Sequence, residues 1–577
     1  MSRQPQLLDS AIRPERPALL RRIAALPGRR LALWLPALLF LAVFFFYPLA
    51  RILTLSLDPA ALSPASLGRA ASVFAFTFFQ AALSALLTLL VGLPAAWLFA
   101  RYDFRARAWL RALTAIPFML PTVVVAAGFN AWLGGRGWLN LLLMNTLGLD
   151  APPIRFVGSL AAILLAHVFY NTTIVVRLVG NALTHLDPRL EQAARTLGAT
   201  PRRLFTAVTL PLLRPPLLAA ALLVFLFDFT SFGVILLLGG ARFATLEVEI
   251  YLQTIQFFNL PLAAWLALIQ LLCTLAFSAL YSRLATRLTA PLGPRPAAVN
   301  LRRPRTARQR LFVIGLSALL VLLFVLPLLS LPLRSLTRLE ADLGDRGGVR
   351  YGLTGAYYAE LFVNRSGSLF YVPPFRALFN SLAYAGLTVI LALALGFPVA
   401  SALARPGRLE RLLDPLLMLP LGASAVTLGL GFIVSFGRWL ASPVFVPLAH
   451  TLIALPFVIR TLQPALAAIP PRLRQAAASL GAAPFRVWQT VDWPIVRRAT
   501  LAAAVFAFTV SLGEFGAAAL LARPEYPTLP TAIYRFLSQP GGMNYGQAMA
   551  MATLLMLVTG AGILLIEKFR LPGAGEF

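Results

Sequence analysis

The chain has 577 residues, of which 59% are hydrophobic and only 12% are charged, and its formal net charge is +29. These values exclude a soluble globular protein, a disordered chain and a small disulfide-stabilised scaffold. The mean hydropathy of +0.79 and recurrent apolar runs of about 20 residues indicate a membrane protein, because a helix of that length crosses a bilayer. Cys273 is the only cysteine, so no disulfide can form within the chain.

The apolar runs predict about twelve transmembrane helices and an all-α polytopic fold, because backbone polar groups in lipid must be satisfied within each helix. In chain order the predicted spans are 31–53, 76–99, 112–133, 158–180, 215–239, 261–282, 311–333, 379–404, 412–436, 444–463, 499–522 and 547–567. The basic segment 1–30 is not a secretory signal, since the apolar run after it is too long and no clear cleavage site closes it.

Basic residues set the predicted orientation. With a cytoplasmic N-terminus, seven segments lie inside and together hold 34 of the 50 Arg and Lys residues: 1–30, 100–111, 181–214, 283–310, 405–411, 464–498 and 568–577. Positive charge concentrates on the cytoplasmic side of membrane proteins, so both termini are expected there. The linker 283–310 carries eight arginines and no acid. Anionic lipid head groups account for it, and we expect no nucleic-acid partner.

The chain repeats itself. A shift of 283 residues aligns 166–251 with 449–534 without a gap, with 33 of 86 positions identical. A shared alanine and leucine bias does not explain matched His, Arg, Gly, Pro and Tyr positions at one constant offset. The predicted organisation is therefore two homologous six-helix halves, 31–282 and 311–567, joined by the linker 283–310 and followed by a tail, 568–577. An even number of spans in each half makes the two repeats parallel.

One inner loop occurs in each half. The first copy, 188–211, begins with Pro-Arg-Leu-Glu-Gln-Ala-Ala and the second copy, 471–494, with Pro-Arg-Leu-Arg-Gln-Ala-Ala. Each is predicted to form a short amphipathic helix that ends at a glycine, followed by a second helical turn that starts at a proline.

These loops resemble the Glu-Ala-Ala motif of permease subunits of binding-protein-dependent ABC importers. The resemblance covers about 70–567 and implies the type I ABC importer permease fold. Both copies have Gln in place of the motif's Glu and Val in place of its Ile, and the second also has Trp in place of Leu. Fused double permeases of this length resemble thiamine and iron(III) importer permeases, and segments such as 238–251 and 511–516 favour the thiamine type.

The resemblance implies that the loops dock on the ATPase. The residues expected to couple the chain to it are Glu191, Gln192, Ala193, Ala194, Gly198 and Pro211 in the first copy, and Arg474, Gln475, Ala476, Ala477, Gly481 and Pro494 in the second. The implied partners are two copies of a cytoplasmic ABC ATPase subunit and a periplasmic or lipid-anchored substrate-binding protein. ATP and Mg would bind the ATPase, and no cofactor is expected on this chain.

Two acids inside predicted spans are candidates for a substrate path, because ionisable groups in a membrane are costly. These are Asp228 and Glu514, with Phe229, Phe232 and Phe515 beside them. Carboxylates and rings would suit a cation moving between the halves. Alternatively, the acids make interhelical hydrogen bonds or pair with Arg177 or Arg460. His167 and His450, which correspond across the repeat, are expected to be packing or hydrogen-bonding residues.

The sequence gives little support for nucleotide binding, metal binding or catalysis by this chain. Glu247 and Glu249 fall in a predicted outer loop, where solvation is favoured over contact with a binding protein. No phosphate-binding Gly-x4-Gly-Lys motif occurs, and the only lysine is Lys568. Neither a metal-ligand cluster nor a catalytic constellation is evident, so the chain is not expected to be an enzyme. An ion-coupled transporter using Asp228 and Glu514 is the remote alternative, although it leaves the paired inner loops unexplained.

Overall fold

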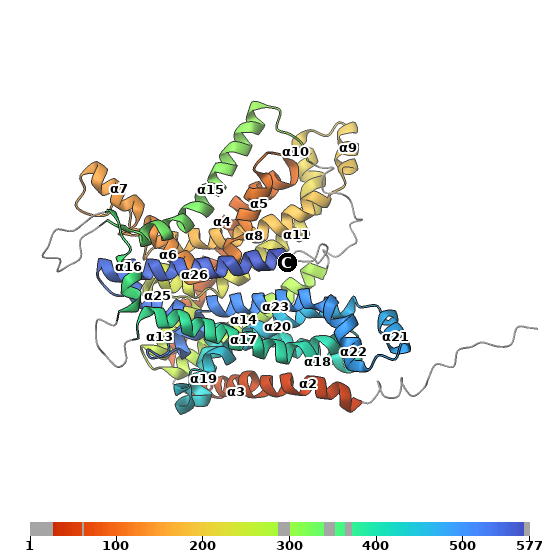
Figure 1. The fold of residues 1–577 in the computed structure, drawn as a ribbon. Helices are drawn as coiled ribbons and strands as arrows, with labels where there is room; N and C mark the ends of the chain where they lie inside the picture. The colour runs from red at the N-terminus through yellow and green to blue at the C-terminus, as the bar shows by residue number, and fades with distance from the viewer. Residues whose placement is uncertain (1–26, 60–62, 287–300, 340–351, 364–371, 570–577) are drawn as a thin grey trace, which may run out of the picture.

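The computed structural model describes residues 27–59, 63–286, 301–339, 352–363 and 372–569. Most of the N-terminal segment, the middle of the linker and the C-terminal tail therefore lie outside the described residues. The chain is a bundle of long helices (Figure 1), which confirms the all-α polytopic fold. The described strands are β1 (Thr337–Arg338) and β2 (Gly352–Leu353), which pair antiparallel.

The helical elements of the first half, including the short π and 3-10 turns marked η, follow in order. They are α2 (Pro27–Leu41), η1 (Ala42–Phe46), α3 (Tyr47–Ser56), α4 (Pro64–Arg101), α5 (Arg107–Ala115), η2 (Pro117–Met119), α6 (Thr122–Leu133), α7 (Trp138–Leu147), α8 (Leu160–His185), α9 (Pro188–Thr196), α10 (Pro201–Leu204), η3 (Phe205–Thr209), α11 (Leu210–Phe229), α12 (Gly233–Leu238), η4 (Ala241–Phe243), α13 (Leu246–Ile255) and α14 (Leu260–Thr286).

The second half follows the same plan after the linker. Its elements are α15 (Ala307–Ser335), α16 (Ala356–Ala359), η7 (Glu360–Phe362), α17 (Pro374–Leu403), α18 (Arg408–Gly422), α19 (Ala425–Phe436), η8 (Gly437–Ala441), α20 (Phe445–Ala467), α21 (Pro471–Ser479), α22 (Pro484–Val487), η9 (Trp488–Asp492), α23 (Trp493–Gly513), α24 (Gly516–Leu521), α25 (Leu529–Leu537) and α26 (Gly542–Phe569).

Among the described residues, nine helices are long and apolar enough to cross a membrane, and the pair α18–α19, bent by 95°, makes ten if it counts as one span. Four predicted spans are not continuous helices. The span 112–133 is interrupted between Ala115 and Thr122, 412–436 bends at residues 423–424, 215–239 ends at Phe229, and 499–522 ends at Gly513. Hydropathy does not detect these interruptions, because most residues around them are apolar or small and the single Glu514 does not change the average of a long window.

Helix α4 begins twelve residues before the predicted span and runs for 38 residues. At a rise of 1.5 Å per residue it is about 57 Å long, well beyond the hydrocarbon thickness. Ser63 caps its N-terminus by accepting a hydrogen bond from the Ser66 amide.

The first helix of each half lies against the other half. Helix α2 contacts α17, and α3 packs between α14 of its own half and α19 of the second half. Correspondingly, α15 packs against α5 and α6 of the first half as well as against α26 of its own. The two halves are thus interlocked rather than placed side by side.

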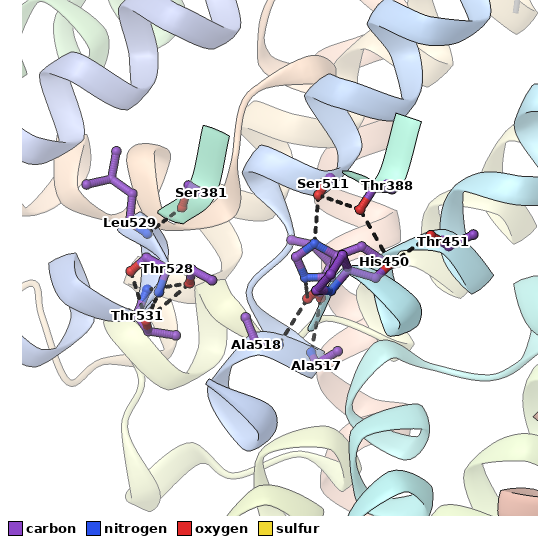
Figure 2. Close-up of polar contacts among 12 residues, drawn as sticks. Ser381, Thr388, His450, Thr451, Ser511, Ala517, Ala518, Thr528, Leu529 and Thr531 are labelled. Carbon is purple, nitrogen blue, oxygen red and sulfur yellow. Dashed lines mark hydrogen bonds and ion pairs between the residues drawn. The ribbon is translucent and has the colours of Figure 1, made fainter. Parts of the chain in front are cut away.

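Corresponding hydrogen bonds support the repeat in three dimensions. The Leu246 amide donates to the Thr77 hydroxyl at 3.0 Å, and the Leu529 amide donates to the Ser381 hydroxyl at 2.7 Å. Figure 2 shows the second of these bonds beside the N-terminus of α25. Both bonds tie the start of a short helix, α13 or α25, to the long helix α4 or α17 of the same half.

Candidate functional site

The two inner loops are at the same end of the bundle (Figure 1). In the first, α9 ends in a turn in which the Ala199 amide donates to the Ala194 carbonyl at 3.0 Å. In the second, the Ala482 amide donates to the Ala477 carbonyl at 3.1 Å. These are six-to-one bonds of the Schellman type, which need a left-handed residue just after the helix. Gly198 (φ 79°) and Gly481 (φ 80°) occupy that position.

Each loop has one apolar side chain that is almost fully exposed. Leu197 and Leu480 correspond across the repeat, and each is 88% exposed. Gln192, Ala193, Gln475 and Ala476 are also exposed, whereas Ala194 and Ala477 are half-buried. The two copies therefore present the same set of exposed side chains at the same end of the bundle.

Replacing both glycines by alanine tests the turn. No atom lies within 4 Å of an added Cβ at Gly198 or Gly481, so the cost is conformational, about 1–2 kcal/mol for each left-handed residue. We expect Gly198→Ala with Gly481→Ala to lower the melting temperature of the purified chain by a few degrees.

Asparagine tolerates the left-handed conformation. The Asn pair at these positions should therefore retain most of the stability, and an equal loss for the Asn and Ala pairs would contradict the turn as the cause.

The loops are anchored differently to their own halves. Glu191, on α9, is buried and pairs with Arg101 at the end of α4. Its counterpart, Arg474 on α21, pairs instead with Asp492 at 2.7 Å, and both side chains are partly exposed. Glu191 therefore ties the first loop to the membrane helix α4, whereas the Arg474 pair lies within the second loop itself, and the glutamine after each of these residues is exposed.

A π-helical turn follows each loop at corresponding positions, η3 in the first half and η9 in the second. Each leads into a membrane helix, α11 or α23, that contains Pro211 or Pro494 in its first turn. Such π turns are frequent at functional sites. The loops thus connect directly to the two interrupted helices.

Both of these helices stop inside the bundle, near an acid. Asp228 is in the last turn of α11, and Glu514 directly follows α23. Neither acid is in the middle of a continuous helix, because each lies where its helix ends. The Glu514 carboxylate accepts hydrogen bonds at 3.1 Å from the Ala517 and Ala518 amides and so caps α24.

A histidine stabilises each interruption. In the first half, Nε2 of His167 bonds the Ser231 hydroxyl at 2.9 Å, and Nδ1 is 3.4 Å from Asp228. In the second, Nδ1 of His450 bonds the Ser511 hydroxyl at 2.7 Å, and Nε2 is 3.3 Å from the carboxylate that caps α24. Figure 2 shows Ser511 and Thr388 on one side of the His450 ring and Ala517 and Ala518 on the other.

The serine and the carboxylate exchange places between the halves. With the offset of 283, Asp228 corresponds to Ser511, and Ser231 corresponds to Glu514. Each histidine is therefore held between one hydroxyl and one carboxylate, in opposite order. The sequence places the two acids three residues out of register, and the shared histidine partner accounts for that difference.

Asp228 lies in the core of the first half. It accepts a hydrogen bond from the Asn171 side chain at 2.6 Å, and its backbone carbonyl accepts one from Gln80. Phe229 packs on Phe74 and on Phe277 of the same half. These contacts match the interhelical hydrogen-bonding interpretation of Asp228. Arg460 pairs with Asp414 at 3.0 Å and not with either acid.

Phe232 and Phe515 meet across the two halves. They correspond in the repeat, and their ring centroids are 5.3 Å apart. Phe232 also contacts Tyr251, at 5.5 Å, and Phe515 contacts the corresponding Tyr534, at 5.6 Å. The hydroxyl groups of Tyr251 and Tyr534 are close enough to interact. We call these four residues the ring cluster.

The expectation that Glu247 and Glu249 are solvated in an outer loop is wrong. Both are on α13, and they are 1% and 0% exposed. Glu249 forms a two-bond ion pair with Arg69, at 2.9 and 2.8 Å. Glu247 accepts a hydrogen bond from Gln270, and burial together with the negative charge of Glu514 raises its pKa to about 8.

Comparison with known proteins places these features in a family. The model of the binding-protein-dependent transport system inner membrane component matches residues 88–290. The thiamine transport system permease protein ThiP of Brucella abortus (strain 2308) is 30% identical over 510 residues, 85% of this chain and 86% of that protein. The chain belongs to this family of ABC importer permeases.

Other relatives of the permease have similar coverage. The thiamine transport system permease proteins of Escherichia coli (strain K12) and Salmonella typhimurium are 29% and 28% identical, over 87% and 96% of this chain and 89% and 98% of their own lengths. Both halves of the permease are therefore aligned in single relatives, which confirms the fused, two-half permease of the resemblance.

The structure brings together only part of the predicted substrate path. Phe232, Phe515 and Glu514 lie at the interface of the halves, whereas Asp228 and Phe229 do not. Tyr251, Tyr534 and Glu247 were not predicted as site residues. The repeated Ile-Tyr pair at 250–251 and 533–534 was a usable signal for the two tyrosines, but hydropathy gave none for the burial of Glu247.

Proposed function

We propose that this chain carries thiamine, or a phosphate ester of thiamine, into the cytoplasm as the membrane subunit of an ABC importer, and that separate ATPase subunits power it. The observation that supports the substrate is the identity of 30% over 85% of the chain to a thiamine transport system permease protein. The paired loops, which protrude at the same end of the bundle, support the coupling to an ATPase.

In this proposal, two copies of the ATPase bind loops 188–211 and 471–494 from the cytoplasm. ATP and Mg bind the ATPase rather than this chain, which acts as a translocation subunit and not as an enzyme. Closing of the ATPase pair moves the loops, and the π turns η3 and η9 pass that movement into α11 and α23. Phe232 and Phe515, which follow these helices within three residues, lie at the interface of the halves, so the movement is proposed to reach the path there.

The binding protein, periplasmic or lipid-anchored, is proposed to deliver substrate to the opposite face. Both termini of the chain are proposed to be cytoplasmic, in agreement with the distribution of basic residues. A reporter fused to either terminus that becomes active on the outer side of the membrane would contradict this orientation.

Reconstitution tests the proposal. The chain is placed in proteoliposomes with its ATPase, with the binding protein present on the side where substrate is added. Uptake of radiolabelled thiamine, thiamine phosphates and iron(III) is then compared. We expect ATP-dependent uptake of thiamine or one of its phosphates, and none when the ATPase or the binding protein is left out. Iron(III) uptake alone would favour the iron importer, and uptake driven by an ion gradient without ATP would favour a secondary transporter.

A further inference from the structure

The ring cluster is built from both halves at equivalent positions. Each half contributes one phenylalanine from just before a short helix, α12 or α24, and one tyrosine from the next helix, α13 or α25. All four side chains are largely buried or half-buried. Stacked and edge-on rings held this way present faces that attract a cation and flat surfaces that stack on a heteroaromatic ring.

Each half also contributes one acid that is close in sequence to a residue of the ring cluster. Glu514 immediately precedes Phe515, and Glu247 is four residues before Tyr251, on the same face of α13. The negative charge of Glu514 disfavours ionisation of Glu247, so the two acids belong to one electrostatic environment. In the repeat, Pro530 corresponds to Glu247 and Ser231 to Glu514, so the pair arises only where the two halves meet.

Only one of the two carboxyl oxygens of Glu247 has a hydrogen-bond partner among the described residues. Its Oε1 accepts a hydrogen bond from Gln270, but its buried Oε2 has no hydrogen-bond partner within the described part of the chain. Ser424, on the other half, lies within reach, although its hydroxyl donates to Thr427. The contacts described for Glu247 include no basic side chain, in contrast to Glu249, which is neutralised by Arg69.

We propose that Glu247, Glu514 and the ring cluster form a substrate site within the permease that takes a flat heteroaromatic cation between the two halves. A positive charge beside both acids favours the ionised form of Glu247 and provides a partner for its buried Oε2. The rings stack on the flat part of the ligand. In this structure the rings contact one another, so the site is closed and opens when the halves separate. This inference rests on the proposed function and adds the location of the substrate in transit.

Direct binding tests the site. The permease–ATPase complex in nanodiscs, without binding protein, is titrated with radiolabelled thiamine, both with and without ATP and vanadate so that closed and opened states are sampled. The wild-type complex should bind thiamine in at least one state. Glu247→Gln and Glu514→Gln should each weaken binding about tenfold or more, because each removes an acid that is ionised when the cation is bound in a desolvated site. Deazathiamine, a neutral analogue of the same shape, should bind more weakly and be insensitive to both substitutions.

A control on the same helix separates a local charge effect from damage to α13. The double variant Arg69→Gln with Glu249→Gln removes a neighbouring ion pair without touching the ring cluster, and thiamine binding should remain within about twofold of wild type. Phe515→Leu should weaken the binding of both thiamine and deazathiamine, because the ring of Phe515 stacks on the ligand whether or not the ligand is charged.

The outcomes separate this inference from the proposed function. ATP-driven thiamine uptake with binding and KM unchanged in both glutamine variants would overturn the site and leave the function standing. Absence of both thiamine uptake and thiamine binding would overturn both. A loss of binding in the Arg69–Glu249 control as large as that in Glu247→Gln would also overturn the site, since the effect would then belong to the helix as a whole.

Discussion

Glu191→Ala should destabilise the permease strongly, whereas the corresponding Arg474→Ala should not. Glu191 and Arg101 are both buried, with side-chain exposures of 11% and 9%. Removing one partner of a buried ion pair leaves the other charge uncompensated, at a cost of about 3–5 kcal/mol. Arg474 and Asp492 are more exposed, at 31% and 15%. Loss of a solvent-screened pair costs about 0–1 kcal/mol. Thermal unfolding of the purified variants measures both effects.

A rescue variant makes the first prediction specific. Arg101→Leu with Glu191→Leu removes both charges together and should recover much of the lost stability, because no buried charge remains unpaired. Transport by the rescued variant should stay low if the ion pair also transmits movement from the loop to α4. Equal destabilisation by Glu191→Ala and Arg474→Ala would show that the first loop is not held by its buried pair.

The second large effect is expected at Asp228. Asp228→Ala removes the acceptor for Asn171 and the carboxylate beside His167, both buried. Each buried donor left without a partner costs about 1–3 kcal/mol. The corresponding change in the other half, Ser511→Ala, leaves His450 in contact with Glu514 and should cost about 1 kcal/mol. The two variants are compared by melting temperature in the same detergent.

Asp228→Asn is the conservative control for this comparison. Its side-chain oxygen can still accept from Asn171, so its stability should be close to that of the wild type. Thiamine binding should also be unchanged in Asp228→Asn. If binding were abolished while stability was preserved, the carboxylate would belong to the substrate path, and its assignment to the core of the first half would be wrong.

Several features could be predicted because they depend on local sequence. The helices, the repeat and the paired loops follow from apolar runs, a constant offset and a Gly-Ala-x-Pro turn. The conformation required of Gly198 and Gly481 is also local, since only the two or three residues around each glycine define a Schellman turn.

Other features depend on contacts that a single segment does not contain. The ends of α11 and α23 are set by histidines on α8 and α20, roughly 60 residues away in sequence. Acidic residues lower the hydropathy of 246–255, so Glu247 and Glu249 were assigned to a solvated loop. Their burial instead depends on Gln270 of α14 and Arg69 of α4. Hydropathy likewise does not show that α2 and α15 pack against the opposite half.

The packing of the first helix of each half against the other half has a consequence for biosynthesis. Helix α2 is synthesised long before α17, on which it packs, because more than 330 residues separate the two helices. During that interval the apolar face of α2 can be covered only by lipid or by a chaperone of the insertion machinery. A chain cut in the linker should accordingly give two fragments that are degraded when made alone and that accumulate when made in the same cell.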